Sequence, residues 1–118
     1  MENKEFSKLL ENRTKKFALS IIKLSTSLPN TPESRVLKNQ ITKSGTSIGA
    51  NYREANRSRS KADFKNKIKI SESEASETVY WLDIINDLNW IDVKSVESVI
   101  KEATEILAIF TSISNKLK

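Results

Sequence analysis

The fold is decided by residues 44–64, which read Ser-Gly-Thr-Ser-Ile-Gly-Ala-Asn-Tyr-Arg-Glu-Ala-Asn-Arg-Ser-Arg-Ser-Lys-Ala-Asp-Phe. Small residues open this stretch, and Gly45 and Gly49 stand four positions apart, so they share one face of a helix. Each glycine inside a helix costs about 1 kcal/mol relative to alanine. We interpret the pair as a surface where a second helix approaches closely, within the subunit or between subunits. A phosphate-binding loop is excluded, because no strand precedes the glycines and no Lys-Ser or Lys-Thr pair follows them.

Apolar residues recur every three or four positions on both sides of this stretch, which is the period of an amphipathic helix. Four such stripes are present, and the first is interrupted only near residues 13–14. A second apolar edge on the third stripe, formed by Tyr80, Trp81, Ile84 and Leu88, predicts that this helix is the most buried of the four. The expected core positions of the first helix are Phe6, Leu10, Phe17, Ile21, Leu24 and Leu28, and those of the second are Leu37, Ile41, Gly45 (or Ser44), Ile48, Tyr52 and Ala55. Those of the third helix are Phe64, Ile68, Ser71, Ala75, Val79, Leu82 and Ile85. Those of the fourth helix are Val96, Val99, Ala103, Ile106, Phe110, Ile113 and Leu117.

Short-range signals mark where each helix begins or ends. The first helix ends at Pro29, because the residue before a proline avoids the α region. Thr31 is a suitable N-cap, with Pro32 following at the first helical position. Residues 60–63, Ser-Lys-Ala-Asp, resemble a capping box that opens the third helix, and Asp92 is expected to cap the fourth. Four helices joined by short loops predict an all-α fold, an antiparallel up-down-up-down four-helix bundle forming one domain over residues 1–118.

Composition excludes several classes of function. The chain contains neither cysteine nor histidine, so it offers no disulfide and no thiolate metal site, and it lacks the commonest general base and the commonest metal ligand. We therefore expect no enzyme, no metal and no cofactor, although a mechanism that uses carboxylates alone stays open. No apolar run approaches the ~20 residues of a membrane span. Residues 1–6 contain no apolar signal core, which leads us to expect a cytoplasmic protein without a membrane partner.

A polar motif lies on or beside the apolar face of the second helix. It comprises Ser47, Asn51 and Glu54, and the latter two stand one helical turn apart. Buried polar groups need partners, so we interpret the motif as an intramolecular hydrogen-bond network. Glu74 and Glu77 on the third helix could reach it across the bundle. A di-iron carboxylate site is rejected, since such sites take a Glu-x-x-His motif from two helices and this chain has no histidine.

Charge is unevenly distributed along the chain, whose net charge is +5. Residues 35–69 contain ten Lys or Arg against two acids, whereas residues 71–91 contain five acids and no Lys or Arg. Three hypotheses fit the basic segment: an ordinary solvated face, a surface for the phosphate backbone of RNA or DNA, or a contact with the acidic segment of a neighbouring subunit. The candidate nucleic-acid-binding residues, most of them recurring every four positions as a ridge, are Arg53, Arg57, Arg59, Lys61, Lys65 and Lys69.

These motifs also carry a resemblance to a known family. Residues 40–55, residues 60–64 and residues 74–82 together resemble the small bacterial four-helix bundle proteins first noticed as reading frames within intervening sequences of large-subunit ribosomal RNA genes. That family is similar to the accessory variability determinant proteins of diversity-generating retroelements. The resemblance covers nearly the whole chain and is most specific at Ser-Ile-x-x-Asn-x-x-Glu, which begins at Ser47. Many members place Gly after that Glu, whereas Ala55 stands here, so we expect this helix to continue further before it turns.

The resemblance implies a ring-like homo-oligomer, typically a pentamer with a basic surface. It also implies association with nucleic acid or a ribonucleoprotein rather than catalysis, with a reverse transcriptase as a possible protein partner. The ridge residues themselves come from charge spacing and not from the family. The sequence therefore favours a non-enzymatic, oligomeric bundle that binds structured RNA or DNA backbone. The alternative hypothesis is a protein–protein scaffold ring with no role in nucleic-acid binding.

Overall fold

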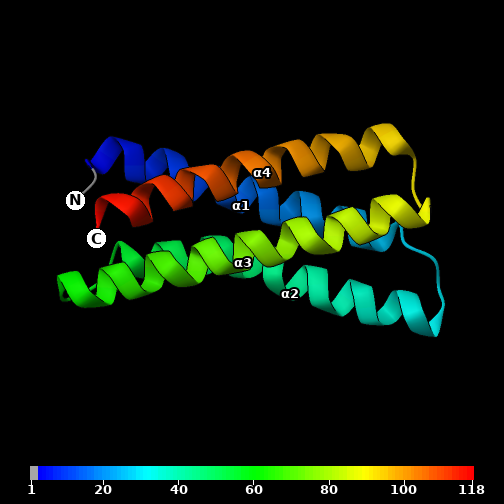
Figure 1. Cartoon of the computed structure of the whole chain (residues 1–118), viewed down its shortest axis with the longest axis horizontal. Coiled ribbons are helices and arrows are strands. Elements are labelled where there is room, and N and C mark those ends of the chain that lie inside the picture. The colour runs from blue at the N-terminus through cyan, green and yellow to red at the C-terminus, as the bar shows by residue number, and fades with distance from the viewer. Residues whose placement is uncertain (1–2) are drawn as a thin grey trace.

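The computed structural model describes residues 3–118, so the expectations for Met1 and Glu2 lie outside the described part. It contains four helices, α1 (Lys4–Thr26), α2 (Pro32–Ala55), α3 (Lys61–Leu88) and α4 (Val93–Lys116) (Figure 1). Consecutive helices run antiparallel, which confirms the predicted all-α up-down bundle. The bundle measures 44 × 24 × 21 Å.

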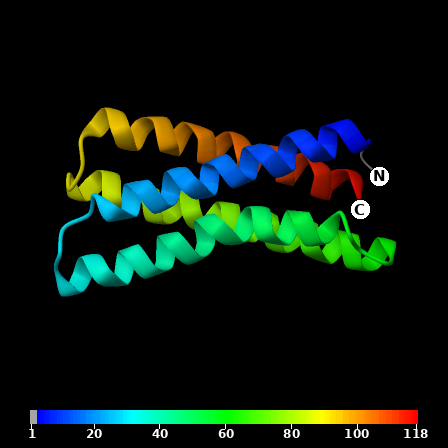
Figure 2. The same cartoon turned by 180° about the vertical axis from the view of Figure 1, so that it is seen from behind.

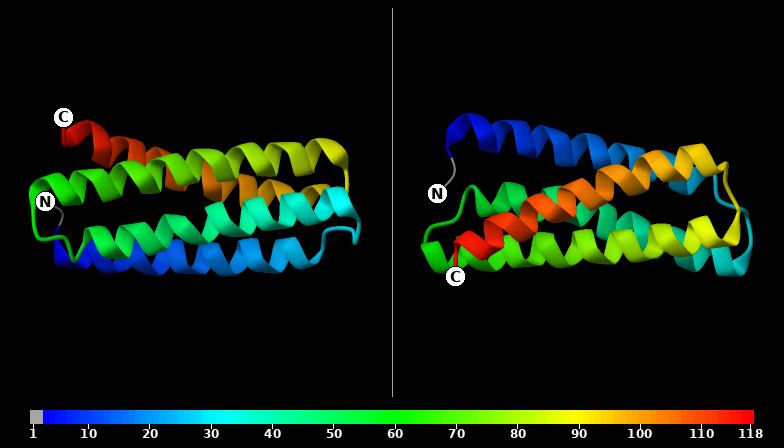
Figure 3. Two further views of the ribbon diagram at one scale, coloured as in Figure 1. Left: turned by 90° about the horizontal axis from the view of Figure 1, so that it is seen from below. Right: turned by 45° about the horizontal axis from the view of Figure 1, so that its top comes forward.

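The helices form two layers. α3 and α4 lie nearer the viewer in Figure 1, and α1 and α2 do so in the reverse view of Figure 2. Every helix packs against its two neighbours around the bundle, and the seam between α1 and α4 is the most sparsely packed. Figure 3 shows why, because α4 crosses obliquely and moves away from α1 towards the end that contains both termini. A charged link spans this seam, with the Arg13 guanidinium 2.7 Å from Glu102 and 2.9 Å from Glu105.

The helix boundaries follow most of the sequence signals. The side chains of Thr31 and Ser60 accept hydrogen bonds from backbone N–H groups three residues later, as a helix N-cap does. Asp92 occupies the N-cap position of α4 but makes no side-chain capping bond, so that part of the prediction is wrong. The expected continuation of α2 beyond Ala55 is also wrong. Asn56 ends the helix because its side-chain amide donates to the Glu11 carboxylate of α1 at 2.8 Å, which holds the chain against α1.

The core matches the predicted stripes with a few exceptions. Phe6, expected inside, is 40% exposed. Thr14, at the interruption of the first stripe, is fully buried, since its hydroxyl donates to the Leu10 and Glu11 carbonyls. The buried apolar residues are Leu10, Phe17, Ile21, Leu24, Leu28, Ile41, Ile48, Tyr52, Ala55, Phe64, Ile68, Ala75, Leu82, Ile85, Val96, Ala103, Ile106, Phe110 and Ile113.

The second apolar edge of α3 is not buried as predicted. Tyr80 is 58% exposed and Leu88 is 44% exposed, while Trp81 and Ile84 are only partly covered. The reason is geometric, since α3 contacts α2 on one side and α4 on the other, which leaves its outward face uncovered. The prediction that α3 is buried on two edges is therefore wrong, and an apolar stripe faces outward instead.

The two glycines of α2 lie against α1 within the same subunit. A Cβ atom added at Gly45 would stand 2.8 Å from Ile21 Cγ2, and one added at Gly49 would stand 2.9 Å from Thr14 Oγ1. Real Cβ atoms essentially never approach other atoms this closely. The predicted close helix–helix packing is confirmed, and the second helix is α1.

Two buried hydroxyl contacts join α2 to α3. The Ser71 hydroxyl donates to the Ile48 carbonyl at 2.9 Å, and the Thr78 hydroxyl lies 2.9 Å from the Ser44 hydroxyl. Sliding one helix along the other would leave the buried Ser71 hydroxyl without its partner, whereas Thr78 would keep its hydrogen bond to the Glu74 carbonyl of its own helix at 2.7 Å. The Ser71 contact therefore favours the observed register of the α2–α3 pair most strongly.

Ser34 gives a first testable prediction. Its side chain is fully buried, and among the described groups its hydroxyl has no hydrogen-bond partner. A buried polar group without a partner costs about 1–3 kcal/mol, so Ser34→Ala is expected to raise the free energy of unfolding by about 1 kcal/mol. Urea denaturation followed by circular dichroism measures the change. A lower denaturation midpoint for the variant would show that the hydroxyl makes a stabilising contact.

Candidate nucleic-acid interface

The up-down topology gathers basic side chains at one end of the bundle. The start of α1, the turn between α2 and α3, and the end of α4 all meet there, as the two termini and the turn show in Figure 1. Segments far apart in sequence thus contribute to one charged region, which we call the basic end. Its members are Lys4, Lys8, Arg53, Arg57, Arg59, Lys61, Lys65, Lys116 and Lys118.

The six predicted ridge residues do not lie along a single face. Arg53 lines a groove between α1 and α2, whereas Lys61 and Lys65 line a hollow with Lys116 beside the start of α3 and the end of α4. These two places belong to the two different layers of the bundle. The chain reverses through residues 56–60, so positions spaced by four before and after the turn cannot stay on one helical face.

The other predicted members complete a path around the end. Arg57 lines a hollow of about 440 Å³ together with Lys4 and Lys8 of α1. Arg59 is exposed in the connection between α2 and α3. Lys69 is exposed on α3, about two helical turns after Lys61. The cations therefore wrap the end of the bundle instead of forming one straight ridge.

The polar motif of α2 serves mainly its own helix. The Ser47 hydroxyl donates to the Lys43 carbonyl at 2.6 Å, and the Asn51 amide donates to the Ser47 carbonyl at 2.9 Å. The expected burial of Glu54 is wrong, since its side chain is 61% exposed and forms an ion pair with Lys67 of α3 at 2.9 Å. This ion pair raises the pKa of Lys67, chiefly through the hydrogen bond and then through the charge of Glu54.

The two glutamates of α3 do not join that motif. Glu77 is exposed and accepts a hydrogen bond from the Trp81 indole N–H at 3.2 Å. Burial raises the pKa of Glu74, and the nearby charge of Glu77 raises it further while Lys43 acts in the opposite direction. Among residues 3–118, no three His, Cys, Asp or Glu side chains are grouped so that they could hold a metal ion. None of the four described helices is both long and apolar enough to cross a membrane.

Among the described Lys and Arg side chains, only Arg13 and Lys67 are held in ion pairs. Arg13 is held by Glu102 and Glu105, which raise its pKa further, and Lys67 is held by Glu54. The remaining Lys and Arg side chains make no ion pair with another described residue. The six predicted binding residues all belong to this unpaired group.

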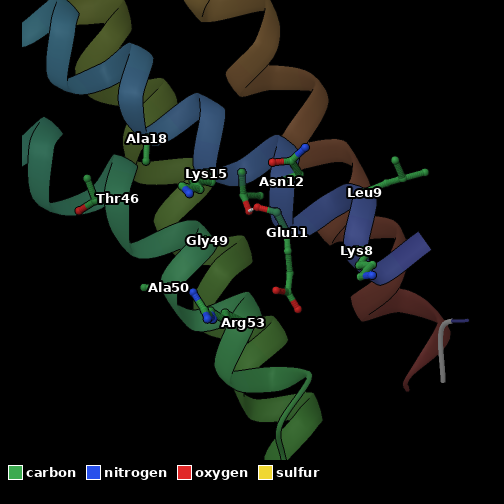
Figure 4. A pocket seen from close by; sticks show the side chains of 11 residues that line it. Lys8, Leu9, Glu11, Asn12, Lys15, Ala18, Thr46, Gly49, Ala50 and Arg53 are labelled. Atoms are coloured by element: carbon green, nitrogen blue, oxygen red, sulfur yellow. Dashed lines mark hydrogen bonds between the residues drawn. The ribbon is translucent and has the colours of Figure 1, made fainter. Parts of the chain in front are cut away.

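A groove between α1 and α2 adds two residues that sequence analysis missed. It has a volume of about 670 Å³, and its lining includes Lys8 and Lys15 of α1 and Arg53 of α2 (Figure 4). The signal was present in the sequence, because Lys4, Lys8 and Lys15 recur at intervals of four and seven residues, which places them on one face of a helix. The basic segment 35–69 by itself does not show which helix lies beside it, and the two lysines of α1 fall outside that segment.

Comparison with known proteins agrees with this architecture. The family model described as 23S rRNA-intervening sequence protein matches residues 9–112. The chain also superposes, with a TM-score of 0.82, on the crystal structure of a protein of unknown function from the S23 ribosomal protein family of Bacteroides thetaiotaomicron VPI-5482. The two sequences are 40% identical over 89% of this chain and 97% of that one. No curated protein matches the chain.

Proposed function

The chain belongs to the 23S rRNA-intervening sequence protein family, and from that premise we propose that it is a non-catalytic homo-oligomer that binds the phosphate backbone of structured RNA or DNA. In this role it acts as an accessory protein of a ribonucleoprotein, for which a reverse transcriptase is the candidate protein partner. The lack of histidine and cysteine argues against most catalytic routes and supports a binding role.

The observation that carries the proposal is the clustering of unpaired cations at the basic end. Lys and Arg side chains bind nucleic acid by neutralising phosphates and releasing condensed counterions. Phe6, which is 40% exposed, is the one exposed aromatic side chain among the described residues there, and no histidine or tryptophan joins it. With nine cations against one exposed ring, we infer that recognition rests mainly on the shape and charge of the backbone.

The outward apolar stripe of α3 supports the oligomeric part of the proposal. Tyr80 and Leu88 are exposed on this face, Ile84 is half-buried, and Trp81 packs partly against the core. Contiguous exposed apolar surface of this kind marks protein–protein contacts. A pentameric ring is the arrangement that the family resemblance suggests. The same stripe favours the second candidate function, a protein scaffold without nucleic acid.

Binding measured across a salt series tests the function. Purified protein, freed of carried-over nucleic acid, is titrated with an RNA hairpin and with a DNA duplex between about 50 and 200 mM salt. We expect affinity to fall steeply, since the logarithm of the binding constant declines by about 0.9 per duplex phosphate contact for each unit of log salt. If neither probe binds at the lowest salt, the nucleic-acid function is wrong and the scaffold function takes its place.

Charge reversal at the basic end gives a second prediction. The double variant Arg57→Glu/Lys61→Glu is expected to lose nearly all binding at ~200 mM salt and to make the duplex salt slope less negative by about 1.8, because two phosphate contacts are lost. Lys23→Glu/Lys94→Glu changes the net charge equally at the opposite end of the bundle and is expected to bind like the wild type. Equal losses in both double variants would mean that overall charge, and not the basic end, determines binding.

A further inference from the structure

The groove between α1 and α2 joins cations that are far apart in sequence. Lys8 and Lys15 come from α1 and Arg53 from α2, and Figure 4 shows all three around the gap between the two helices. Glu11 is the only acid in the lining. Three cations and one carboxylate leave an excess of two positive charges in a groove of about 670 Å³. That excess is complementary to a polyanion.

The single acid in the groove is already engaged. The Asn56 amide donates to Glu11 Oε2 at 2.8 Å, which directs this carboxylate towards the α2–α3 turn. Neither Arg53 nor either lysine of the groove forms an ion pair with it. The three cations are therefore available to an incoming anion without first breaking an internal ion pair.

The residues that line the groove suit a sugar–phosphate backbone more than they suit bases. Small residues line much of it, with Gly49 from the close α1–α2 contact beside Ala18 and the exposed Ala50. Leu9 is its one large apolar side chain, and its lining contains no aromatic side chain. Base binding by single-strand-binding proteins relies on stacking against aromatic rings, and none is available here. Lys8 and Lys15 stand seven residues apart, which corresponds to about 10 Å along the helix and about three base-pair steps of duplex axis.

The groove is continuous with the basic end. Lys8 and Glu11 line both the groove and the hollow that contains Lys4 and Arg57. A strand lying in the groove would pass Lys15, then Lys8 and Arg53, and then reach the turn between α2 and α3. One surface path thus connects α1 to the residues expected from the sequence.

We propose that the α1–α2 groove holds the sugar–phosphate backbone of one nucleic-acid strand, with Lys8, Lys15 and Arg53 contacting its phosphates. This inference rests on the proposed function and adds to it the path of the strand and two binding residues on α1. Arg53 supplies a planar guanidinium that can contact a phosphate through two N–H groups, while the two lysines act as point charges.

A matched pair of double variants on α1 tests the groove. Lys8→Glu/Lys15→Glu reverses the charge of the two groove lysines. The control, Lys16→Glu/Lys23→Glu, reverses the charge of two exposed lysines on the same helix with the same spacing, and neither of them lines a described hollow. We expect the groove variant to bind the RNA hairpin and the DNA duplex at least tenfold more weakly, with a duplex salt slope less negative by about 1.8. The control variant is expected to stay within about twofold of wild type. Equal binding by the two variants overturns the inference.

Thiol protection locates the strand independently of charge. Because the chain has no cysteine, Ala50→Cys places a single thiol in the groove, and Ser112→Cys places one on the exposed outer face of α4. Saturating RNA hairpin is expected to slow alkylation at the first position at least fivefold and to leave the second unchanged; repeating this with the DNA duplex distinguishes the two nucleic acids. If Ala50→Cys binds the hairpin as tightly as the wild type and its thiol is not protected, the groove path alone is overturned. If the wild type binds neither probe, the proposed function itself is overturned.

Discussion

Gly45→Leu is expected to abolish the cooperative unfolding transition or to lower the free energy of unfolding by about 3 kcal/mol or more, the upper end of overpacking effects. A Cβ atom at this position would meet three atoms of the Ile21 side chain at 2.8–3.1 Å. Ile21 is fully buried and β-branched, so it has neither space nor a free rotamer in which to move away. The two backbones must separate, and that opens the α1–α2 contact on which the groove is built. Circular dichroism during urea denaturation measures the loss.

The alanine variants make this test sharper because two effects oppose each other. Helix propensity alone predicts that Gly45→Ala and Gly49→Ala each stabilise α2 by about 1 kcal/mol. The contacts with Ile21 and Thr14 predict the opposite sign, a net loss of about 1–2 kcal/mol each, because overpacking outweighs the gain in propensity. Ala50→Leu, on the exposed face of the same helix, is the control and is expected to unfold like the wild type. A higher denaturation midpoint for both alanine variants would show that α1 and α2 can separate at little cost.

The sequence predicted this contact because two glycines in a helix are costly unless a neighbouring helix requires them. It could not identify the partner, since Ile21 resembles the other apolar positions of the first stripe and Thr14 lies at the point where that stripe is interrupted. Thr14 packs against Gly49, and its polar group can be buried there because the hydroxyl donates to carbonyls of its own helix. Periodicity thus predicts which face is inside, while the pairing of faces depends on how the helices are arranged.

Because sequence patterns do not show which helix faces lie side by side, the predictions at the candidate site were also partly wrong. The predicted residues, Arg53 to Lys69, come from one continuous segment, whereas the surface is assembled from helix ends that the antiparallel topology brings together. Lys8 and Lys15 were missed although the predicted antiparallel topology places the start of α1 beside the end of α2, because charge was compared only within one continuous segment. Glu54 was expected inside because it stands one turn from Asn51, yet it lies at the edge of α2, where it reaches Lys67.

The second large effect is expected at the apolar stripe of α3. Tyr80→Glu/Leu88→Glu is expected to convert the proposed homo-oligomer into single chains, with a dissociation constant raised at least a hundredfold, because carboxylates in an apolar contact lose their hydration without gaining partners. Both side chains are exposed in the isolated bundle, at 58% and 44%, so the fold itself is expected to survive. Light scattering after size-exclusion chromatography measures the mass, and circular dichroism verifies the helices.

Leu19→Glu/Ile22→Glu makes the same chemical change on the outer face of α1 and is expected to leave the assembly intact. If this pair dissociates the oligomer while the α3 pair does not, the subunit contact lies on α1 and not on α3. The α3 variant also separates assembly from binding, because each single chain keeps its groove and its basic end. Its affinity for RNA should fall through the loss of multivalency, whereas the number of phosphate contacts per chain stays the same. A single chain that loses all binding even at low salt would instead mean that the binding surface is formed between subunits.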